Sequence, residues 1–205
     1  MNKTLVIIFV KNSIPGTVKT RLASAIGNQG AFEIYNTLVD LTRQAVKNLE
    51  ADKHVYFSKT IEENSWNGFE KHVQQGNDLG ERMYNAFQNG FQKGYERIAL
   101  IGSDLPDIST ELIKSAFHKL GQNELVFGPA QDGGYYLIGM SKLHSQVFQN
   151  KPWSTAALLE ITLNELEKDD TPYSLLETLN DIDTLEDLQA SAFFKNNTLL
   201  QSKIK

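Results

Sequence analysis

The 205-residue sequence contains no cysteine. A disulfide framework, a thiolate metal site and a cysteine nucleophile are therefore excluded, and the composition fits a reducing compartment. The sequence also lacks an excess of positive charge, because 25 acidic residues outnumber 20 lysines and arginines and give a net charge of -5. Without a basic field to attract a polyanion, general nucleic-acid binding is disfavoured, and any phosphate chemistry must be local.

Long hydrophobic runs are absent as well. The longest one, LVIIFV at residues 5–10, is far too short to span a bilayer and lacks the pattern of a signal peptide. We therefore expect a cytoplasmic enzyme or binding protein without a membrane partner. With 40% hydrophobic and 22% charged residues, the composition is typical of a globular protein with one sizeable core.

Apolar runs typical of β-strands alternate with helical patterns along the chain. The runs cover residues 4–10, 54–59, 97–104, 124–130 and 135–140, with a weaker one at 173–179. Apolar residues at three-to-four spacing and capping residues predict helices over 29–49, 79–91, 109–120, 154–166 and 184–194. This alternation predicts a single α/β domain with a mostly parallel sheet over residues 1–195, followed by a polar tail at 196–205.

A loop rich in cations follows the first predicted strand. The stretch KNSIPGTVKTRL at residues 11–22 places a turn at Pro15-Gly16 and then Lys19 and Arg21. A glycine in such a loop lets backbone N–H groups approach an anion, and the cations can hold phosphate oxygens. The spacing is neither that of a Walker loop nor that of GxGxxG. On these residues alone, a phosphate-binding loop and an ordinary charged turn are equally supported.

Asp104 ends the apolar run RIALIGSD and is followed by Leu105-Pro106. In open α/β sheets ligands bind beyond the carboxyl ends of the strands, and Mg²⁺ is held by one or two carboxylates together with substrate oxygens. This position favours Asp104 as a metal ligand over the alternative that it caps a turn. Asp107 and Ser109 are instead typical of the cap of the next helix.

Two further acidic motifs follow later apolar runs. Asp132 precedes Gly133 and Gly134, a pair that either leaves room for a ligand against the backbone or forms a hairpin turn. Asp181 and Asp183 lie two residues apart, so their side chains face one side if the segment is extended. Both motifs are therefore candidates for the same site as Asp104.

Six motifs in the sequence carry a resemblance to a known family. They are FVKNSIPGTVKTRLASAIG, DLGERM, LIGSDLPDI, GPAQDGGYYLIGM, PWST and NDIDTLEDL, and they run from the first predicted strand to the last predicted helix. In this order they resemble a bacterial family of GT-A type glycosyltransferases that occur in arsenosugar-biosynthesis contexts. That family is in turn similar to the molybdenum-cofactor nucleotidyltransferases and the phospholactate guanylyltransferases. The resemblance implies the nucleotide-diphospho-sugar transferase fold, a Rossmann-like mixed sheet flanked by helices.

The resemblance also implies roles for individual residues. Asp104, with Asp183 or less favourably Asp181, would bind Mg²⁺ or Mn²⁺, and Asp132 would face the transferred group. The catalytic set would be Asp104, Lys19 and Asp132. The nucleotide-binding set would be Lys11, Gly16, Lys19, Arg21, Arg82, Gly133 and Gly134.

Two departures from the family pattern stand out. Relatives often carry proline at the position of Ser13, and many GT-A enzymes have Asp-x-Asp where this chain has Asp104-Leu105-Pro106. The second departure leaves glycosyl transfer less strongly indicated than nucleotide binding.

These features predict a metal-dependent transferase with a nucleotide or nucleotide-sugar substrate and a small-molecule acceptor. The favoured reaction is glycosyl transfer from a nucleotide-diphospho-sugar. The alternatives are a nucleotidyltransferase that releases pyrophosphate from a nucleoside triphosphate, and a non-catalytic nucleotide-binding module. None of the four histidines lies in these motifs, and we assign none of them a catalytic role.

Overall fold

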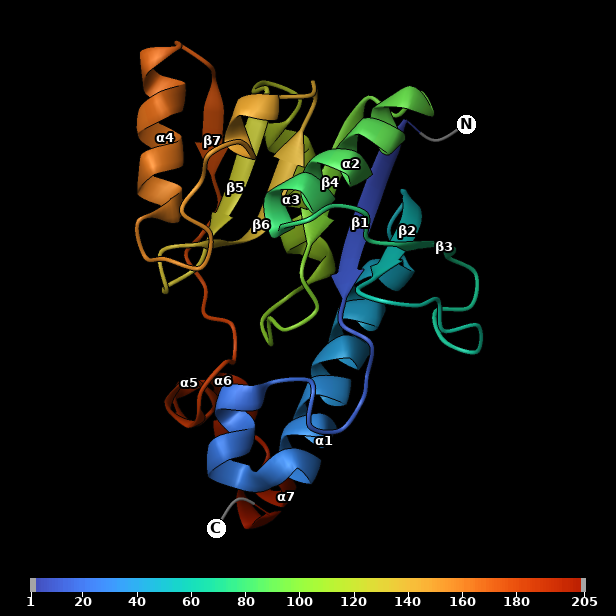
Figure 1. Cartoon of the computed structure of the whole chain (residues 1–205), viewed down its shortest axis with the longest axis vertical. Helices are drawn as coiled ribbons and strands as arrows, with labels where there is room; N and C mark the ends of the chain where they lie inside the picture. Colours follow the sequence, from blue (N-terminus) through green and yellow to red (C-terminus); the bar gives the residue numbers. More distant parts are fainter. Residues whose placement is uncertain (1–2, 204–205) are drawn as a thin grey trace.

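A seven-stranded sheet forms the centre of the protein (Figure 1). The computed structural model describes residues 3–203, and the strand order is β3-β2-β1-β4-β6-β5-β7. The strands are β1 (Thr4–Val10), β2 (Asp52–Phe57), β3 (Glu70–Val73), β4 (Arg97–Ile101), β5 (Leu125–Pro129), β6 (Tyr135–Met140) and β7 (Tyr173–Leu175).

The direction of the strands brings three strand ends together. β6 runs antiparallel to its neighbours β4 and β5, whereas β1 pairs parallel with β2 and β4, β2 with β3, and β5 with β7. The predicted mostly parallel, mixed sheet is therefore confirmed. Because β5 runs in the same direction as β1 and β4, the carboxyl ends of all three lie at one edge of the sheet, the edge where ligands bind in open α/β folds.

Helices cover both faces of this sheet. α1 and α3 pack on one face and α2 and α4 on the other. Successive residues of a strand point to opposite faces, so in β1 Val6 and Ile8 contact the first layer while Leu5 and Ile7 contact the second. No helix within residues 3–203 is long and apolar enough to cross a membrane. The helices are α1 (Thr20–Lys47), α2 (Leu79–Gln92), α3 (Thr110–Lys119), the 3₁₀ helix η1 (Ser145–Val147), α4 (Leu158–Lys168), α5 (Leu185–Ala190), α6 (Ala192–Lys195) and α7 (Thr198–Lys203).

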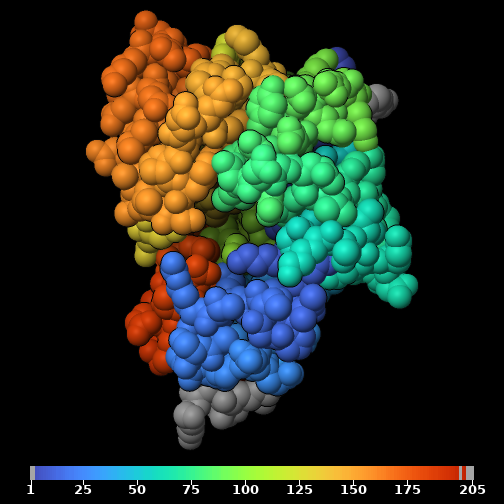
Figure 2. Space-filling model, viewed as in Figure 1, coloured from blue at the N-terminus to red at the C-terminus, as the bar shows by residue number. Residues whose placement is uncertain are grey.

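A third, smaller core lies beyond the carboxyl edge of the sheet. It joins the first part of α1 to the C-terminal helices, which lie below the sheet in Figure 1. The surface is hollowed between this unit and the body of the protein (Figure 2). The segment predicted as a polar tail contains α7, whose Leu200 packs against this core, and residues 204–205 lie outside the described part of the chain. The buried side chains of this core are Leu22, Ala31, Ile34, Leu38, Ile182 and Leu188.

The predicted strands are all present, and β3 is an additional one. Its sequence, EKHV, buries none of its residues fully because β3 lies at the edge of the sheet. Edge strands carry charged side chains that discourage pairing with other chains. The strand therefore lacks the apolar run by which the others are recognised.

Three predicted helices differ from the observed ones by more than one residue. α1 begins earlier than expected and continues through a kink at Gly27, whose φ of 79° interrupts the helical spacing. α4 begins at Leu158 and not at the predicted Ser154, whose left-handed φ of 63° is incompatible with a helix. The helix predicted over 184–194 is divided at Ser191, whose extended backbone ends α5 and whose hydroxyl accepts from the Phe194 N–H to cap α6.

Candidate active site

Three aspartates lie together at the carboxyl edge of the sheet. Asp104 follows β4, and Asp181 and Asp183 lie on the segment between β7 and α5. One carboxylate oxygen from each residue lies within 4.8 Å of the other two. The two segments are also joined through the backbone, since the Ile182 N–H donates to the Asp104 carbonyl at 3.3 Å. The structure thus brings the sequence-predicted acidic residues into one cluster.

Lys19 lies between two of these carboxylates. Its Nζ donates to Asp104 Oδ2 at 2.9 Å and to Asp183 Oδ1 at 2.8 Å, and its side chain is 1% exposed. The residue precedes α1 with a left-handed φ of 48°. Such a backbone costs about 1–3 kcal/mol at a residue other than glycine. The two ion pairs offset this strain and aim the ammonium into the acidic cluster.

The charges of the cluster shift its pKa values in different directions. Burial lowers the pKa of Lys19, but the Asp104 and Asp183 carboxylates outweigh burial and hold that pKa above its ordinary value. Burial raises the pKa of Asp104, but the Lys19 ammonium outweighs it and holds that pKa below its ordinary value. Burial and then the negative charge of Asp104 raise the pKa of Asp181 to about 6. A further cation bound at the cluster would therefore lower the pKa of Asp181.

Helix α5 holds the acidic segment in place. Thr184 and Asp187 form a capping box, in which Asp187 Oδ2 accepts from the Thr184 N–H at 2.8 Å and Thr184 Oγ1 accepts from the Asp187 N–H at 3.2 Å. Asp187 Oδ2 also accepts from the Asp183 N–H at 3.2 Å. Asp187 is thus a positioning residue for the backbone that carries Asp183.

Two residues that the sequence analysis missed hold the loop after β1. Asn12 is 6% exposed, its Nδ2 donates to the Thr60 carbonyl at 2.8 Å and its Oδ1 accepts from the Lys59 N–H at 2.8 Å. The Tyr35 hydroxyl accepts from the Lys11 N–H at 2.8 Å and donates to the Lys11 carbonyl at 3.0 Å. The sequence signal for Asn12 is its place just after a buried strand. Tyr35 offers only its place in the apolar spacing of the helix predicted over 29–49.

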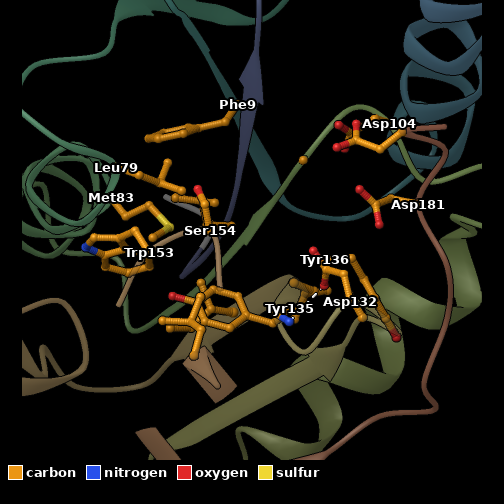
Figure 3. A pocket seen from close by; sticks show the side chains of 18 of the residues that line it. Phe9, Leu79, Met83, Asp104, Asp132, Tyr135, Tyr136, Trp153, Ser154 and Asp181 are labelled. Atoms are coloured by element: carbon orange, nitrogen blue, oxygen red, sulfur yellow. Dashed lines mark hydrogen bonds between the residues drawn. The ribbon is translucent and has the colours of Figure 1, made fainter. Parts of the chain in front are cut away.

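A cavity of about 320 Å³ opens beside the acidic cluster (Figure 3). One side is acidic, and the opposite side is apolar. Figure 3 shows Asp104 and Asp181 on the acidic side and Phe9, Met83 and Trp153 on the other. Ligand pockets combine apolar surface with a few placed polar groups in this way. The acidic side is formed by Asp104, Asp181 and Asp183, and the apolar side by Phe9, Leu79, Met83 and Trp153.

Residues of the hairpin between β5 and β6 line the cavity between its acidic and apolar sides. Asp132 and Gly134 line the cavity, and Asp132 Oδ1 accepts from the Gly134 N–H at 2.8 Å. Gly133 has a φ of 87°, and a Cβ there would lie 2.0 Å from the Ala156 carbonyl oxygen, so that only glycine fits. The glycine pair therefore forms the hairpin turn that was one of the two alternatives, with Gly134 at the cavity and Gly133 packed against the loop before α4.

Two neighbouring tyrosines at the start of β6 differ in their hydrogen bonds. The Tyr136 hydroxyl donates to the Glu177 carbonyl at 2.9 Å. The Tyr135 hydroxyl is buried and has no hydrogen-bond partner among the described residues, although the side chain lines the cavity. A buried hydroxyl without a partner is costly, and a ligand that reached this oxygen through the cavity would supply the missing hydrogen bond.

The other predicted nucleotide-binding residues lie in different surroundings. Arg21 is 74% exposed, with Nη1 3.9 Å from Asp183 Oδ2, and the Lys11 ammonium also helps to lower the pKa of Asp104. Gly16 has a left-handed φ of 80° in the loop, and Arg82 Nε donates to the Gly76 carbonyl at 3.1 Å. The structure thus brings the charges of Lys11 and Arg21 near the acidic cluster, whereas Gly16 and Arg82 have roles in the local backbone. Within the described part of the chain, Gly134 is the one predicted nucleotide-binding residue that lines the cavity.

The fold is that of the nucleotide-diphospho-sugar transferases. The chain is similar to the crystal structure of a "putative nucleotide-diphospho-sugar transferase" from Desulfovibrio desulfuricans G20, with 33% identity and a TM-score of 0.89 over 100% of this chain and 99% of the other. The chain belongs to the family described as "uncharacterized protein conserved in bacteria (DUF2064)", which matches residues 40–155. The arsenosugar context and the likeness to molybdenum-cofactor and phospholactate enzymes stay predictions.

More distant structures share the fold alone. CMP:2-keto-3-deoxy-manno-octonic acid synthetase complexed with CTP has 10% identity and a TM-score of 0.58, over 98% of this chain and 99% of the other. Rv0371C from Mycobacterium tuberculosis H37Rv in complex with manganese has 11% identity and a TM-score of 0.53, over 95% of this chain and 98% of the other. No curated protein matches this sequence significantly.

Proposed function

We propose that this protein is a metal-dependent transferase that binds a nucleotide or nucleotide sugar in the cavity and transfers a glycosyl group from a nucleotide-diphospho-sugar to a small acceptor. The observation that carries the proposal is the convergence of Asp104, Asp181 and Asp183 within 4.8 Å of one another at the carboxyl edge of the sheet. The likeness to a nucleotide-diphospho-sugar transferase structure over the whole chain supports it.

The donor set fits a divalent ion such as Mg²⁺ or Mn²⁺. Carboxylate oxygens are the ligands that these hard ions prefer. Three ionised aspartates carry three negative charges and Lys19 one positive charge, which leaves two negative charges for one divalent ion to neutralise. Asp104 and Asp183 would hold the ion, with Asp181 as a third ligand. When bound, the ion would supply positive charge to the phosphate oxygens of the substrate, and a distant structural relative was crystallised with manganese.

Lys19, Arg21 and the amino end of α1 would form the phosphate side of the site. A departing nucleoside diphosphate gains negative charge, and fixed cations stabilise that charge most in the transition state. Arg21 is exposed enough to turn toward a ligand, and a helix amino end attracts phosphate through its free N–H groups. Loss of one such contact typically lowers the rate by roughly a hundredfold or more.

The apolar side of the cavity would select the second substrate. Phe9, Met83 and Trp153 offer hydrophobic surface there, which the hydroxyl groups of a simple sugar would leave unmatched. We therefore expect a partly apolar acceptor, with an oxygen or nitrogen that accepts from the Tyr135 hydroxyl. Asp132 lines the cavity between the two sides, where its carboxylate can accept a proton from an acceptor hydroxyl.

Nucleotidyl transfer is the second candidate. It is favoured by the structure of CMP:2-keto-3-deoxy-manno-octonic acid synthetase, which has the same fold and was solved in complex with CTP. In this reaction the second substrate attacks the α-phosphate of a nucleoside triphosphate, the new phosphorus–oxygen bond forms, and pyrophosphate leaves. The same cations would then stabilise pyrophosphate instead of a nucleoside diphosphate.

A two-stage experiment tests the proposal. A thermal-shift screen of nucleoside triphosphates and nucleotide sugars, with and without Mn²⁺, identifies ligands because binding to the folded state raises Tm. Phosphorus NMR of those ligands with candidate acceptors then distinguishes the products: nucleoside diphosphate for glycosyl transfer, pyrophosphate for nucleotidyl transfer. Binding without turnover would favour a non-catalytic module. Failure of every nucleotide to bind in the presence of metal would overturn the proposal.

A further inference from the structure

A second cluster of metal-ligating side chains lies at the β2–β3 edge of the sheet. One ligand atom from each of His54, Glu70 and His72 lies within 4.8 Å of the other two. His54 Nε2 is 3.0 Å from Glu70 Oε2, and His72 Nε2 is 3.0 Å from Glu70 Oε1. Glu70 begins β3, so the cluster lies toward the amino ends of the strands, whereas the candidate active site lies at their carboxyl ends.

The strand register explains why these three side chains meet. In the parallel pair of β2 and β3, His54 lies opposite Glu70 and Tyr56 lies opposite His72. Residues two apart in a strand share a face, so both histidines and the glutamate point to the same side of the sheet. The Tyr56 ring stacks on His72 with centroids 4.6 Å apart, and the Tyr95 ring meets His54 edge-on at 5.6 Å. The two imidazoles are thus held by aromatic neighbours.

One imidazole of the cluster is buried and incompletely hydrogen-bonded within the described part of the chain. His54 has a side chain only 2% exposed, and its Nδ1 has no hydrogen-bond partner among the described residues. His72 Nε2 instead faces Glu70 Oε1 at 3.0 Å. The nitrogens that face Glu70 are His54 Nε2 and His72 Nε2, and imidazole nitrogen is a common metal ligand.

The same place already attracts a cation. The Lys93 ammonium, at the end of α2, forms an ion pair with Glu70 Oε1. Its side chain is 37% exposed, so it can move away into solvent. A metal ion and the Lys93 ammonium would compete for the same carboxylate.

We propose that His54, Glu70 and His72 form a binding site for Zn²⁺ or a similar borderline transition-metal ion, separate from the acidic site. Two imidazoles and one carboxylate are a typical three-ligand set for zinc. Tetrahedral zinc at its usual bond lengths separates its ligands by about 3.3 Å. Each imidazole lies 3.0 Å from a different Glu70 oxygen, and the three ligand atoms lie within 4.8 Å of one another, so side-chain rotation would have to bring them around one ion. His72 also lines a hollow of about 560 Å³, from which water can reach the fourth position.

The ion bound here would differ from the one at the active site. Hard Mg²⁺ prefers oxygen ligands, whereas imidazole nitrogen favours zinc, nickel and copper. Because β2 supplies one ligand and β3 supplies two, the ion would join the edge strand to the sheet. Binding to the folded chain alone would raise its stability by mass action.

Zinc titration of the full chain tests this site. Metal-free protein is titrated with ZnCl₂ in competition with a chromogenic chelator, and Tm is measured in parallel with ZnCl₂ and with MgCl₂. The D104N/D183N double variant removes the acidic site from the measurement. We expect one tight zinc ion per double-variant chain and a rise in Tm with zinc but not with magnesium. Absence of tight zinc binding by this variant would overturn the proposal, whatever the outcome of the nucleotide experiments.

Single substitutions assign the ligands. His72→Gln should weaken zinc binding by at least about a hundredfold, since even residues that only support a ligand cost ten- to a hundredfold. Lys93→Gln should leave the affinity unchanged or raise it by up to about fivefold, the range that loss of one exposed ion pair allows. His144→Gln is the matched control, because His144 Nε2 lies 2.8 Å from Glu124 Oε2 in a pair outside this cluster. The His72→Gln variant should fold, because the His72 side chain is 23% exposed. Equal zinc affinity of His72→Gln and His144→Gln would overturn the assignment.

Discussion

The Lys19 ammonium lies 2.9 Å from the Asp104 carboxylate, although 85 positions separate the two residues in the sequence. The ammonium also pairs with Asp183 at 2.8 Å. One buried lysine therefore holds together two segments that each follow a different strand of the sheet. We infer that Lys19 acts as an internal counter-ion of the acidic cluster, a role that its place in a charged loop after β1 did not reveal.

Replacing Lys19 by methionine should make the folded protein depend on added metal. The variant leaves Asp104 and Asp183 close together without their shared cation, which should lower the free energy of unfolding by about 1–3 kcal/mol. The loss is smaller than for a fully buried ion pair because both carboxylates are partly exposed. A divalent ion restores the missing charge. Mn²⁺ should therefore raise the Tm of Lys19→Met by more than it raises that of the unmodified protein.

Arg21→Met serves as the matched control for this measurement. Arg21 also faces Asp183, but its side chain is 74% exposed, so its loss should change the free energy of unfolding by less than about 1 kcal/mol. If Mn²⁺ shifts the Tm of Lys19→Met no further than that of the unmodified protein, Lys19 is not the counter-ion of a metal site.

Asp104→Asn should abolish metal-dependent nucleotide binding and leave the fold intact. An amide keeps the shape of the side chain but removes the charge that attracts a divalent ion. Calorimetric titration of Mn²⁺ together with the best nucleotide ligand measures the loss, and circular dichroism checks the fold. Asp107→Asn is the control, because Asp107 follows the same strand but is exposed. An unchanged metal dependence in Asp104→Asn would show that Asp104 is only a turn residue.

Asp187→Asn should reduce stability at neutral pH but not in acid. Burial raises the pKa of Asp187, but hydrogen bonds from Thr184 and its neighbours outweigh burial and hold the folded-state pKa below the ordinary value of 3.8. A carboxyl group with a lowered folded-state pKa stabilises the fold above its unfolded-state pKa and loses that contribution as pH falls. At pH 7 the variant should be less stable by about 0.5–1 kcal/mol, the usual range for a lost helix cap.

Urea unfolding at a series of pH values from 7 down to 3 measures this effect. The difference in unfolding free energy between the two proteins should be constant above about pH 5 and shrink below the ordinary pKa of 3.8. Glu186→Gln, in the same first turn of α5 but exposed, should show no such difference. A difference that stays constant down to pH 3 would mean that the carboxylate charge of Asp187 contributes nothing.

The sheet could be predicted from the sequence because its inner strands are buried on both faces. Runs such as LVIIFV in β1 must be apolar throughout when helices cover both sides, and Leu5 to Ile8 are all fully buried. β3 could not be predicted for the opposite reason, since an edge strand needs few apolar residues. The kink at Gly27 hid the first part of α1 because it breaks the helical spacing.

The acidic side of the site could be predicted because a carboxylate at the end of a buried strand has little structural purpose. Asp104 is such a residue, and the turn between β7 and α5 brought Asp183 beside it. The partner of Lys19 could not be predicted, because a sequence gives no direction for a long side chain. The apolar side was also missed, because Phe9, Met83 and Trp153 come from separate elements and each is typical of an ordinary core.

Tyr135→Phe should weaken substrate binding without destabilising the protein. The Tyr135 hydroxyl is buried and lacks a hydrogen-bond partner among the described residues, so its removal costs no bond within the protein and should leave Tm unchanged or raise it. If the hydroxyl donates to the acceptor substrate, its loss should raise KM for that substrate by about tenfold, the effect of roughly 1.4 kcal/mol.

Tyr136→Phe is the control for Tyr135→Phe, because it also removes one tyrosine hydroxyl from β6. Tyr136→Phe removes the bond to the Glu177 carbonyl and should lower the free energy of unfolding by about 1 kcal/mol. The two variants should therefore show opposite patterns, with binding reduced in Tyr135→Phe and stability reduced in Tyr136→Phe. Chemical denaturation and steady-state kinetics on both proteins measure the two quantities. A Tyr135→Phe variant that loses stability and keeps its KM would show that the hydroxyl is bonded inside the protein, and the apolar side of the cavity would then have no donor for a substrate at this position.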